Sequence, residues 1–126
     1  MQSGRESILL AEDEPLVRGM IATSLRNLGY NVLEASDGAE ALQLAQEFPA
    51  GDIQLLLSDV VMPRMNGIEL SRRFRDMFPD AKILLMSGYT EEADIQGAIS
   101  DSSIAFLPKP FSLHELAEKV REVLNQ

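Results

Sequence analysis

Acidic side chains stand at two places in the sequence where an apolar run ends. Glu12 and Asp13 follow the run 7–11, and Asp59 follows the run 53–58. Three carboxylates in one crevice repel one another unless a cation holds them. Oxygen ligands suit Mg²⁺, and no His or Cys lies nearby to favour zinc. If the runs are strands whose ends converge, the carboxylates predict a Mg²⁺ site that also accepts a phosphate.

A hydroxyl group and an ammonium group end two later apolar runs. Ser87 closes the run 82–87, and Lys109 follows the run 104–107 between two prolines. Lys109 offers a second positive charge to a phosphoryl group or a carboxylate, and Ser87 offers a hydrogen bond to a phosphoryl oxygen. Taken singly, each polar residue here has a simpler explanation as a turn, a helix cap or a surface charge. Their common place at the ends of apolar runs favours one site.

Short apolar runs alternate with segments of helical periodicity along the whole chain. We expect strands at 7–11, 30–35, 53–58, 82–87 and 104–107, and helices at 15–28, 37–48, 67–78, 90–100 and 112–124. The first helix carries its apolar residues at helical spacing: Val17, Met20, Ile21, Leu25 and Leu28. Parallel strands need crossover connections, so this alternation predicts an α/β fold with helices on both faces of a parallel sheet. Such sheets bind ligands at the carboxyl ends of their strands.

Length and composition restrict the chain to a few classes of protein. Its 126 residues suit one domain, which we expect over 7–126 after a tail or linker remnant at 1–6. The net charge of −9 repels phosphate backbones, so we expect no direct binding of nucleic acid. Apolar stretches too short for a membrane span, and a sequence without cysteine, lead us to expect a cytoplasmic domain with no membrane contact.

Four stretches of the sequence resemble the receiver domains of response regulators in two-component systems. They are residues 10–14 (LAEDE), 57–67 (LSDVVMPRMNG), 85–88 (LMSG) and 106–111 (FLPKPF). The resemblance covers 7–124 and extends to receivers at the carboxyl end of hybrid sensor histidine kinases. It implies a flavodoxin-like (CheY-like) fold with strand order 2-1-3-4-5 and five helices. It also implies a part in a phosphorelay.

The same resemblance assigns roles to the polar residues. It implies that Asp59 accepts the phosphoryl group from a phosphohistidine on a histidine kinase or a phosphotransfer protein. Asp13, Asp59 and the backbone carbonyl of Val61 would bind Mg²⁺, and Glu12 would act mainly through metal-bound water. Lys109 would contact the phosphoryl group. The domain would catalyse only its own phosphorylation and dephosphorylation.

The resemblance further implies a conformational switch. Ser87 and Phe106 match the switch pair of the family, in which the hydroxyl moves toward the phosphoryl oxygen and the aromatic ring turns inward. The peptide bond from Lys109 to Pro110 would be cis. A downstream protein partner would bind the face formed by roughly 91–124.

Three other functions fit parts of the sequence. A phosphatase of the haloacid dehalogenase type would need a second acid two residues after the nucleophile, where this chain has Val61. A flavodoxin-like cofactor binder would need a first loop that attracts phosphate, whereas residues 12–14 are all acidic. A degenerate receiver could serve only as a docking module, but the complete set of acidic, hydroxyl and lysine residues argues against it.

Overall fold

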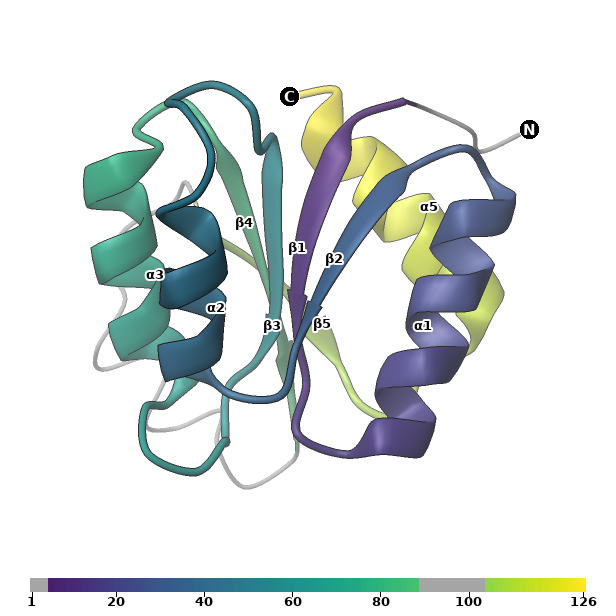
Figure 1. The fold of residues 1–126 in the computed structure, drawn as a ribbon. Helices are drawn as coiled ribbons and strands as arrows, with labels where there is room; N and C mark the ends of the chain where they lie inside the picture. The colour runs from purple at the N-terminus through teal and green to yellow at the C-terminus, as the bar shows by residue number, and fades with distance from the viewer. Residues whose placement is uncertain (1–4, 89–103) are drawn as a thin grey trace.

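The computed structural model describes residues 5–88 and 104–126. These residues form five strands and four helices, labelled α1, α2, α3 and α5 (Figure 1). The strands are β1 (Ser7–Ala11), β2 (Asn31–Ala35), β3 (Leu55–Asp59), β4 (Lys82–Ser87) and β5 (Ile104–Pro108). The helices are α1 (Pro15–Asn27), α2 (Gly38–Ala45), α3 (Gly67–Met77) and α5 (Leu113–Leu124). The helix predicted over 90–100 lies outside the described residues.

The strands form one parallel sheet in the order β2-β1-β3-β4-β5, as the resemblance implies. Register brings the carboxyl ends of the central strands together. Ala11 pairs with Ser58, and Asp59 pairs with Met86. The residues that follow β1 and β3 therefore meet at one edge of the sheet, at the bottom of Figure 1. This is the edge where an open α/β sheet binds its ligands.

Two apolar cores lie on opposite faces of the sheet, because successive residues of a strand point to opposite sides. Leu10 and Leu57 pack in the core with residues of α1 and α5, whereas Leu9 and Leu56 pack in the core with residues of α2 and α3. All four leucines are fully buried. Each contributes about 2 kcal/mol of burial free energy. Figure 1 shows the two helix pairs on either side of the sheet.

Side-chain caps fix the starts of three described helices, α2, α3 and α5. The Asp37 carboxylate accepts a hydrogen bond from the Glu40 backbone N–H at 2.8 Å, and so begins α2. The Glu40 carboxylate accepts from the Ser36 N–H at 2.6 Å, one residue earlier than a regular capping box requires. At α5 a capping box between Ser112 and Glu115 is complete in both directions.

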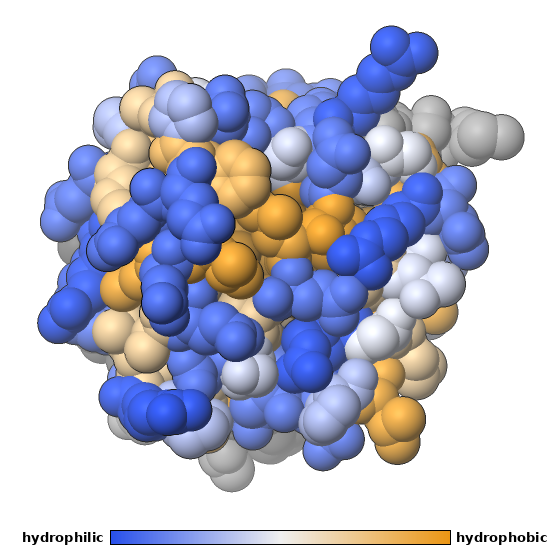
Figure 2. Space-filling view, in the orientation of Figure 1, coloured by the Kyte–Doolittle hydropathy of each residue, from blue (hydrophilic) through white to orange (hydrophobic). Residues whose placement is uncertain are grey.

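The first turns of α1 depart from the expected pattern. Ile21 and Leu25 are buried, but Val17 is 39% exposed and Met20 is 59% exposed, beside Leu16 at 77%. The helix begins at the edge of the sheet, so its first turns have less of the sheet to cover (Figure 1). Apolar atoms reach the surface over this end of α1, at the lower right of Figure 2.

The ends of the described chain are joined at the opposite edge of the sheet. Arg121 of α5 forms an ion pair with Glu6 at 2.6 Å and donates a hydrogen bond to the Tyr30 hydroxyl at 3.2 Å. The carbonyl of Glu6 accepts from the Asn31 N–H at 3.0 Å, which ties the entering segment to β2. Of the helices in the described ranges, none has the length and apolar character needed to span a bilayer.

Candidate functional site

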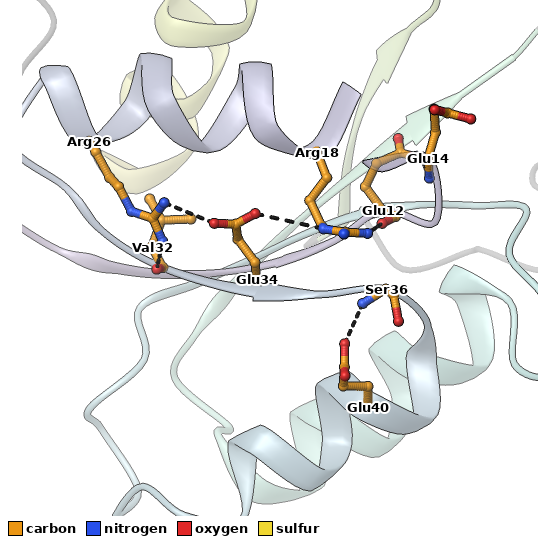
Figure 3. Close-up of polar contacts among 8 residues, drawn as sticks. All are labelled: Glu12, Glu14, Arg18, Arg26, Val32, Glu34, Ser36 and Glu40. Atoms are coloured by element: carbon orange, nitrogen blue, oxygen red, sulfur yellow. Dashed lines mark hydrogen bonds and ion pairs between the residues drawn. The ribbon is translucent and has the colours of Figure 1, made fainter. Parts of the chain in front are cut away.

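The loop between β1 and α1 holds Glu12 from several directions. The Glu12 backbone N–H donates to the carbonyl of Ala35 at 3.0 Å, and one Glu12 carboxylate oxygen accepts from the Glu14 N–H at 3.1 Å. Arg18 donates to the Glu12 carbonyl at 2.8 Å (Figure 3). Glu12 is only 2% exposed, whereas the next residue, Asp13, is exposed. The loop thus carries one buried and one accessible carboxylate.

Asp59 is the last residue of β3, and the chain folds back closely behind it. The Gly67 N–H donates to the carbonyl of Val60 at 2.7 Å. A Cβ atom on Gly67 would lie 2.3 Å from the carbonyl oxygen of Asp59, so only glycine allows this approach. The Val60 N–H donates to the carbonyl of Met86 at 3.1 Å, which extends the pairing with β4 past the acid. Asp59 is 6% exposed and held at a fixed place.

Lys109 reaches Asp59 from the end of β5. Its ammonium nitrogen lies 2.9 Å from Asp59 Oδ2, and its backbone N–H donates to the carbonyl of Ser87 at 2.8 Å. The peptide bond between Lys109 and Pro110 is cis, as the resemblance implies. The ends of β3, β4 and β5 are therefore linked through one lysine.

The three predicted carboxylates come together. Glu12, Asp13 and Asp59 each offer an oxygen within 4.8 Å of the others. Glu12 Oε1 and Asp59 Oδ1 are buried, and neither has a hydrogen-bond partner within the described ranges. A buried carboxylate oxygen without a partner is costly unless a cation or ordered water satisfies it. This donor set of oxygens alone fits a hard divalent cation such as Mg²⁺.

Burial disfavours the charged forms of two of these carboxyl groups. Burial, together with the nearby charge of Asp59, raises the pKa of Glu12 to about 6, although the Glu14 N–H and Lys109 act against the rise. Burial also raises the pKa of Asp59, and the hydrogen bond and charge of Lys109 oppose this effect. Like charges therefore accumulate in a region of low solvation, a condition that a bound cation relieves.

The raised pKa of Glu12 predicts a pH dependence of stability in the metal-free protein. As the pH rises from 4.5 to about 6, the native state holds this proton more firmly than the unfolded chain, so the free energy of unfolding falls. The ionisation of Glu12 lowers the free energy of unfolding by about 1–2 kcal/mol over this pH range. Glu12→Gln should remove it and raise stability at pH 7, as measured by urea unfolding in EDTA at several pH values. Glu14→Gln, at an exposed position of the same loop, is the matched control, and equal slopes in both variants would contradict the prediction.

The remaining predicted site residues lie around this group. Ser87 is 3% exposed at the end of β4, and the Val61 side chain is 57% exposed in the loop after β3. Phe106, in the middle of β5, is half-buried against the core that α2 and α3 cover. Val61 lies two residues after Asp59 along the chain. Ser87 lies near Asp59 in the sheet, because it follows Met86, which pairs with Asp59. Their predicted roles, and that of Phe106, stay predictions.

A groove of about 610 Å³ extends from the carboxylates along the first turns of α1. Its polar end contains Glu12, Asp13, Asp59 and Lys109, and its apolar part contains Val17, Met20 and Leu113. The sequence pattern marked Val17 and Met20 only as residues of an apolar helix face. Spacing alone does not reveal that such residues lie beyond the sheet and line a groove.

Comparison with known proteins identifies the family. The sequence pattern of the response regulator receiver domain matches residues 8–121. The chain belongs to the receiver domain family. The receiver domain is 44% identical over 124 residues to the sensor kinase CckA of Brucella abortus (strain 2308), covering 98% of this chain and 13% of that protein. It therefore spans only a small part of this relative's length.

A second relative consists almost entirely of a receiver. The receiver domain is 38% identical over 117 residues to the response regulator receiver protein CpdR of the same organism, covering 93% of this chain and 95% of that protein. The crystal structure of the receiver domain from the hybrid histidine kinase CckA has a TM-score of 0.79 and 41% identity, and covers 94% of this chain. These likenesses indicate a signalling domain of a two-component system.

Proposed function

We propose that the receiver domain accepts a phosphoryl group on Asp59 in a phosphorelay. One observation carries the proposal: Asp59 Oδ2 is paired with Lys109 at 2.9 Å, while Asp59 Oδ1 is buried without a partner beside two further carboxylates. A carboxylate that only stabilised the fold would have both oxygens satisfied. An oxygen left free next to a lysine and a candidate cation site suits a nucleophile.

The carboxylates of Glu12, Asp13 and Asp59, with the backbone carbonyl of Val61, would hold Mg²⁺. When bound, Mg²⁺ supplies positive charge that offsets the charge of the transferred phosphoryl oxygens. Glu12, whose second oxygen already accepts from the Glu14 N–H, is the member best suited to act through a water molecule. Asp13, the exposed carboxylate, is the one most accessible to an incoming ion.

The donor we propose is a phosphohistidine on a histidine kinase or a phosphotransfer protein. An Asp59 oxygen forms a bond to phosphorus as the bond between phosphorus and the imidazole nitrogen breaks. The imidazole leaves with that electron pair and takes a proton from water. Lys109 keeps Asp59 ionised and oriented, and its charge also offsets that of the phosphoryl oxygens. The chain modifies itself, so we do not propose a turnover enzyme. The phosphoryl group of such donors comes ultimately from ATP, which is held in the cytoplasm. We therefore propose a cytoplasmic location.

The phosphoryl group would then change the surface of the domain. The Ser87 carbonyl accepts a hydrogen bond from the Lys109 N–H, and Ser87 directly follows Met86, the residue of β4 that pairs with Asp59. Phe106 pairs with Leu85 on the adjacent strand, so a shift of Ser87 can be passed to β5. We propose that Ser87 and Phe106 are the switch pair and that the face 91–124 binds the downstream protein.

The apolar part of the groove suits an apolar surface on the protein that carries the phosphohistidine. Val17, Met20 and Leu113 line it, and they continue directly to Asp59 and Lys109. A donor protein seated there would have its imidazole next to the Asp59 carboxylate. Continuity with the acceptor therefore favours the phosphodonor protein as the occupant of this surface.

Incubation with acetyl phosphate and Mg²⁺, followed by intact-mass analysis, tests the proposal. We expect one added phosphoryl group per chain, which disappears when EDTA replaces Mg²⁺. If the chain gains no mass under conditions that label an established receiver, the proposal is contradicted. The alternative of a degenerate receiver that serves only as a docking module would then be favoured. Continuous release of inorganic phosphate without a stable adduct would instead favour the phosphatase.

A substitution in the groove should slow phosphoryl transfer from a protein donor but not labelling by acetyl phosphate. Met20→Glu should slow transfer from a phosphorylated histidine kinase domain about tenfold, because a charge replaces an apolar contact of about 1.4 kcal/mol. Labelling by acetyl phosphate should stay within twofold, since the small donor does not need the groove. Phe48→Glu, at another exposed apolar residue located after α2, is the matched control. Equal slowing in both variants would contradict the docking surface.

A further inference from the structure

We propose that Arg18 is a positioning residue that sets the affinity of the acidic site for Mg²⁺. Arg18 is not one of the residues that would hold the cation, which are Glu12, Asp13, Asp59 and Val61. Its position within the first helix does not mark it as part of the site. It acts through the main chain of Glu12. The inference rests on the proposed function, because it assumes that the site binds Mg²⁺.

A chain of polar contacts runs from the edge strand to the acidic loop (Figure 3). Arg18 Nη1 donates to the carbonyl of Glu12 at 2.8 Å, and Arg18 Nε lies 3.7 Å from Glu34 Oε1 on β2. The other oxygen of Glu34 accepts from Arg26 at 2.8 Å. Arg26 also donates to the carbonyl of Val32 at 2.7 Å. Glu34 therefore bridges two arginines, of which only Arg18 reaches the site.

The position of this contact gives it a specific consequence. The Glu12 carbonyl belongs to the peptide that joins Glu12 to Asp13, the two carboxylates that β1 contributes to the site. The N–H on the other side of Glu12 is already fixed by Ala35. With Arg18 in place, both ends of Glu12 are held, and the peptide plane cannot rotate without breaking a hydrogen bond. A rotation at Glu12 that is not compensated at Asp13 would move the two carboxylates relative to each other and to Asp59.

A loop held in this way offsets the repulsion among the three carboxylates. Without a cation, repulsion favours turning the β1–α1 loop outward, away from Asp59. A site that keeps its shape when empty loses less free energy on binding than one that must be assembled. Residues that orient metal ligands without touching the metal commonly change metal affinity by about 10- to 100-fold. Arg18 is placed to do this for two ligands at once.

An ordinary surface ion pair would have different properties. The Arg18 side chain is 21% exposed, against 47% for Arg26. Exposed pairs contribute little to stability, because water and salt screen them. Arg26 is therefore a natural comparison, because it shares Glu34 but directs its other donor to Val32. The two arginines separate a general effect on α1 and β2 from a specific effect on the acidic loop.

The experiment measures the Mg²⁺ dissociation constant of the whole chain by isothermal titration, with Mg²⁺ alone as the probe. Arg18→Met should raise the dissociation constant about tenfold. Arg18→Lys should raise it less, because its ammonium group can still donate to the Glu12 carbonyl although it cannot also reach Glu34. Glu34→Gln, which leaves Arg18 in place, should raise it about threefold by loosening Arg18. Arg26→Met should stay within twofold of the wild type. The rate of labelling by acetyl phosphate at saturating Mg²⁺ should stay within twofold in every variant.

The outcomes are distinguishable. Equal dissociation constants for wild type and Arg18→Met overturn the inference, and so does an equal loss in Arg18→Met and Arg26→Met. Should Arg18→Met not fold, Arg18→Lys and Glu34→Gln decide in its place by the same comparison. A wild type that binds no Mg²⁺ overturns the proposed function, and with it the inference.

Discussion

Replacing Asp59 by asparagine is expected to abolish phosphoryl labelling by acetyl phosphate while leaving the fold intact. The amide has nearly the same shape as the carboxylate, and its oxygen can still accept a hydrogen bond from Lys109. It has no ionised oxygen to attack phosphorus, so the loss should be complete. Removing one of three converging carboxylates also relieves repulsion, so the melting temperature in EDTA should not fall. Intact-mass analysis and thermal unfolding measure the two effects.

Two further variants control this result. Asp52→Asn changes an exposed aspartate in the loop before β3 and should label like the wild type. Asp13→Asn should retain the acceptor but require more Mg²⁺ for the same rate. Undiminished labelling of Asp59→Asn would contradict the assignment. Peptide mapping would then locate the modified side chain.

Replacing Gly67 by alanine is expected to be among the most destabilising single-methyl changes in the described chain. The added Cβ would lie 2.3 Å from the Asp59 carbonyl oxygen and 3.1 Å from the Val60 Cα. Both atoms belong to the main chain and cannot turn aside as a side chain can. Relief requires a shift of the β3–α3 loop, with a loss of about 3 kcal/mol in the free energy of unfolding. Labelling of Asp59 should slow as well, because the acceptor moves with its backbone.

Gly19→Ala is the matched control for this substitution. Gly19 lies inside α1, and a Cβ there has no neighbour within 4 Å. Alanine is favoured over glycine in a helix, so this variant should gain about 0.5–1 kcal/mol. Urea unfolding of both variants gives the comparison. A Gly67→Ala protein as stable as the wild type would show that the loop can relax without cost.

The acidic site could be predicted because its members follow strands. Glu12, Asp13 and Asp59 are each next to a run of buried residues, and parallel strands place such positions at one edge. Lys109 was found by the same argument from the end of β5. The order of the strands could not be predicted in the same way, since the alternation of elements predicts a parallel sheet but not which strands are neighbours. That order came from the resemblance and is confirmed.

Other features could not be found from local patterns. Helical spacing put Val17 and Met20 on an apolar face, but it could not show that the first turns of α1 leave them exposed in the groove that contains Asp59. The contact between Arg18 and the acidic loop could not be predicted from the sequence. Arg18 donates to a main-chain carbonyl, which any residue at position 12 would offer. At α2 the reciprocal bond of the capping box is displaced by one residue, because the Glu40 carboxylate accepts from the Ser36 N–H and not from the N–H of the N-cap residue Asp37.

The ion pair between Glu6 and Arg121 lies at the end of the sheet opposite Asp59. Glu6 and the end of α5 therefore both lie at the edge of the sheet away from the carboxylates. A neighbouring domain joined at either of these two points would be attached at the edge of the sheet opposite Asp59. Of the two curated relatives, one is a long sensor kinase and the other is almost entirely a receiver.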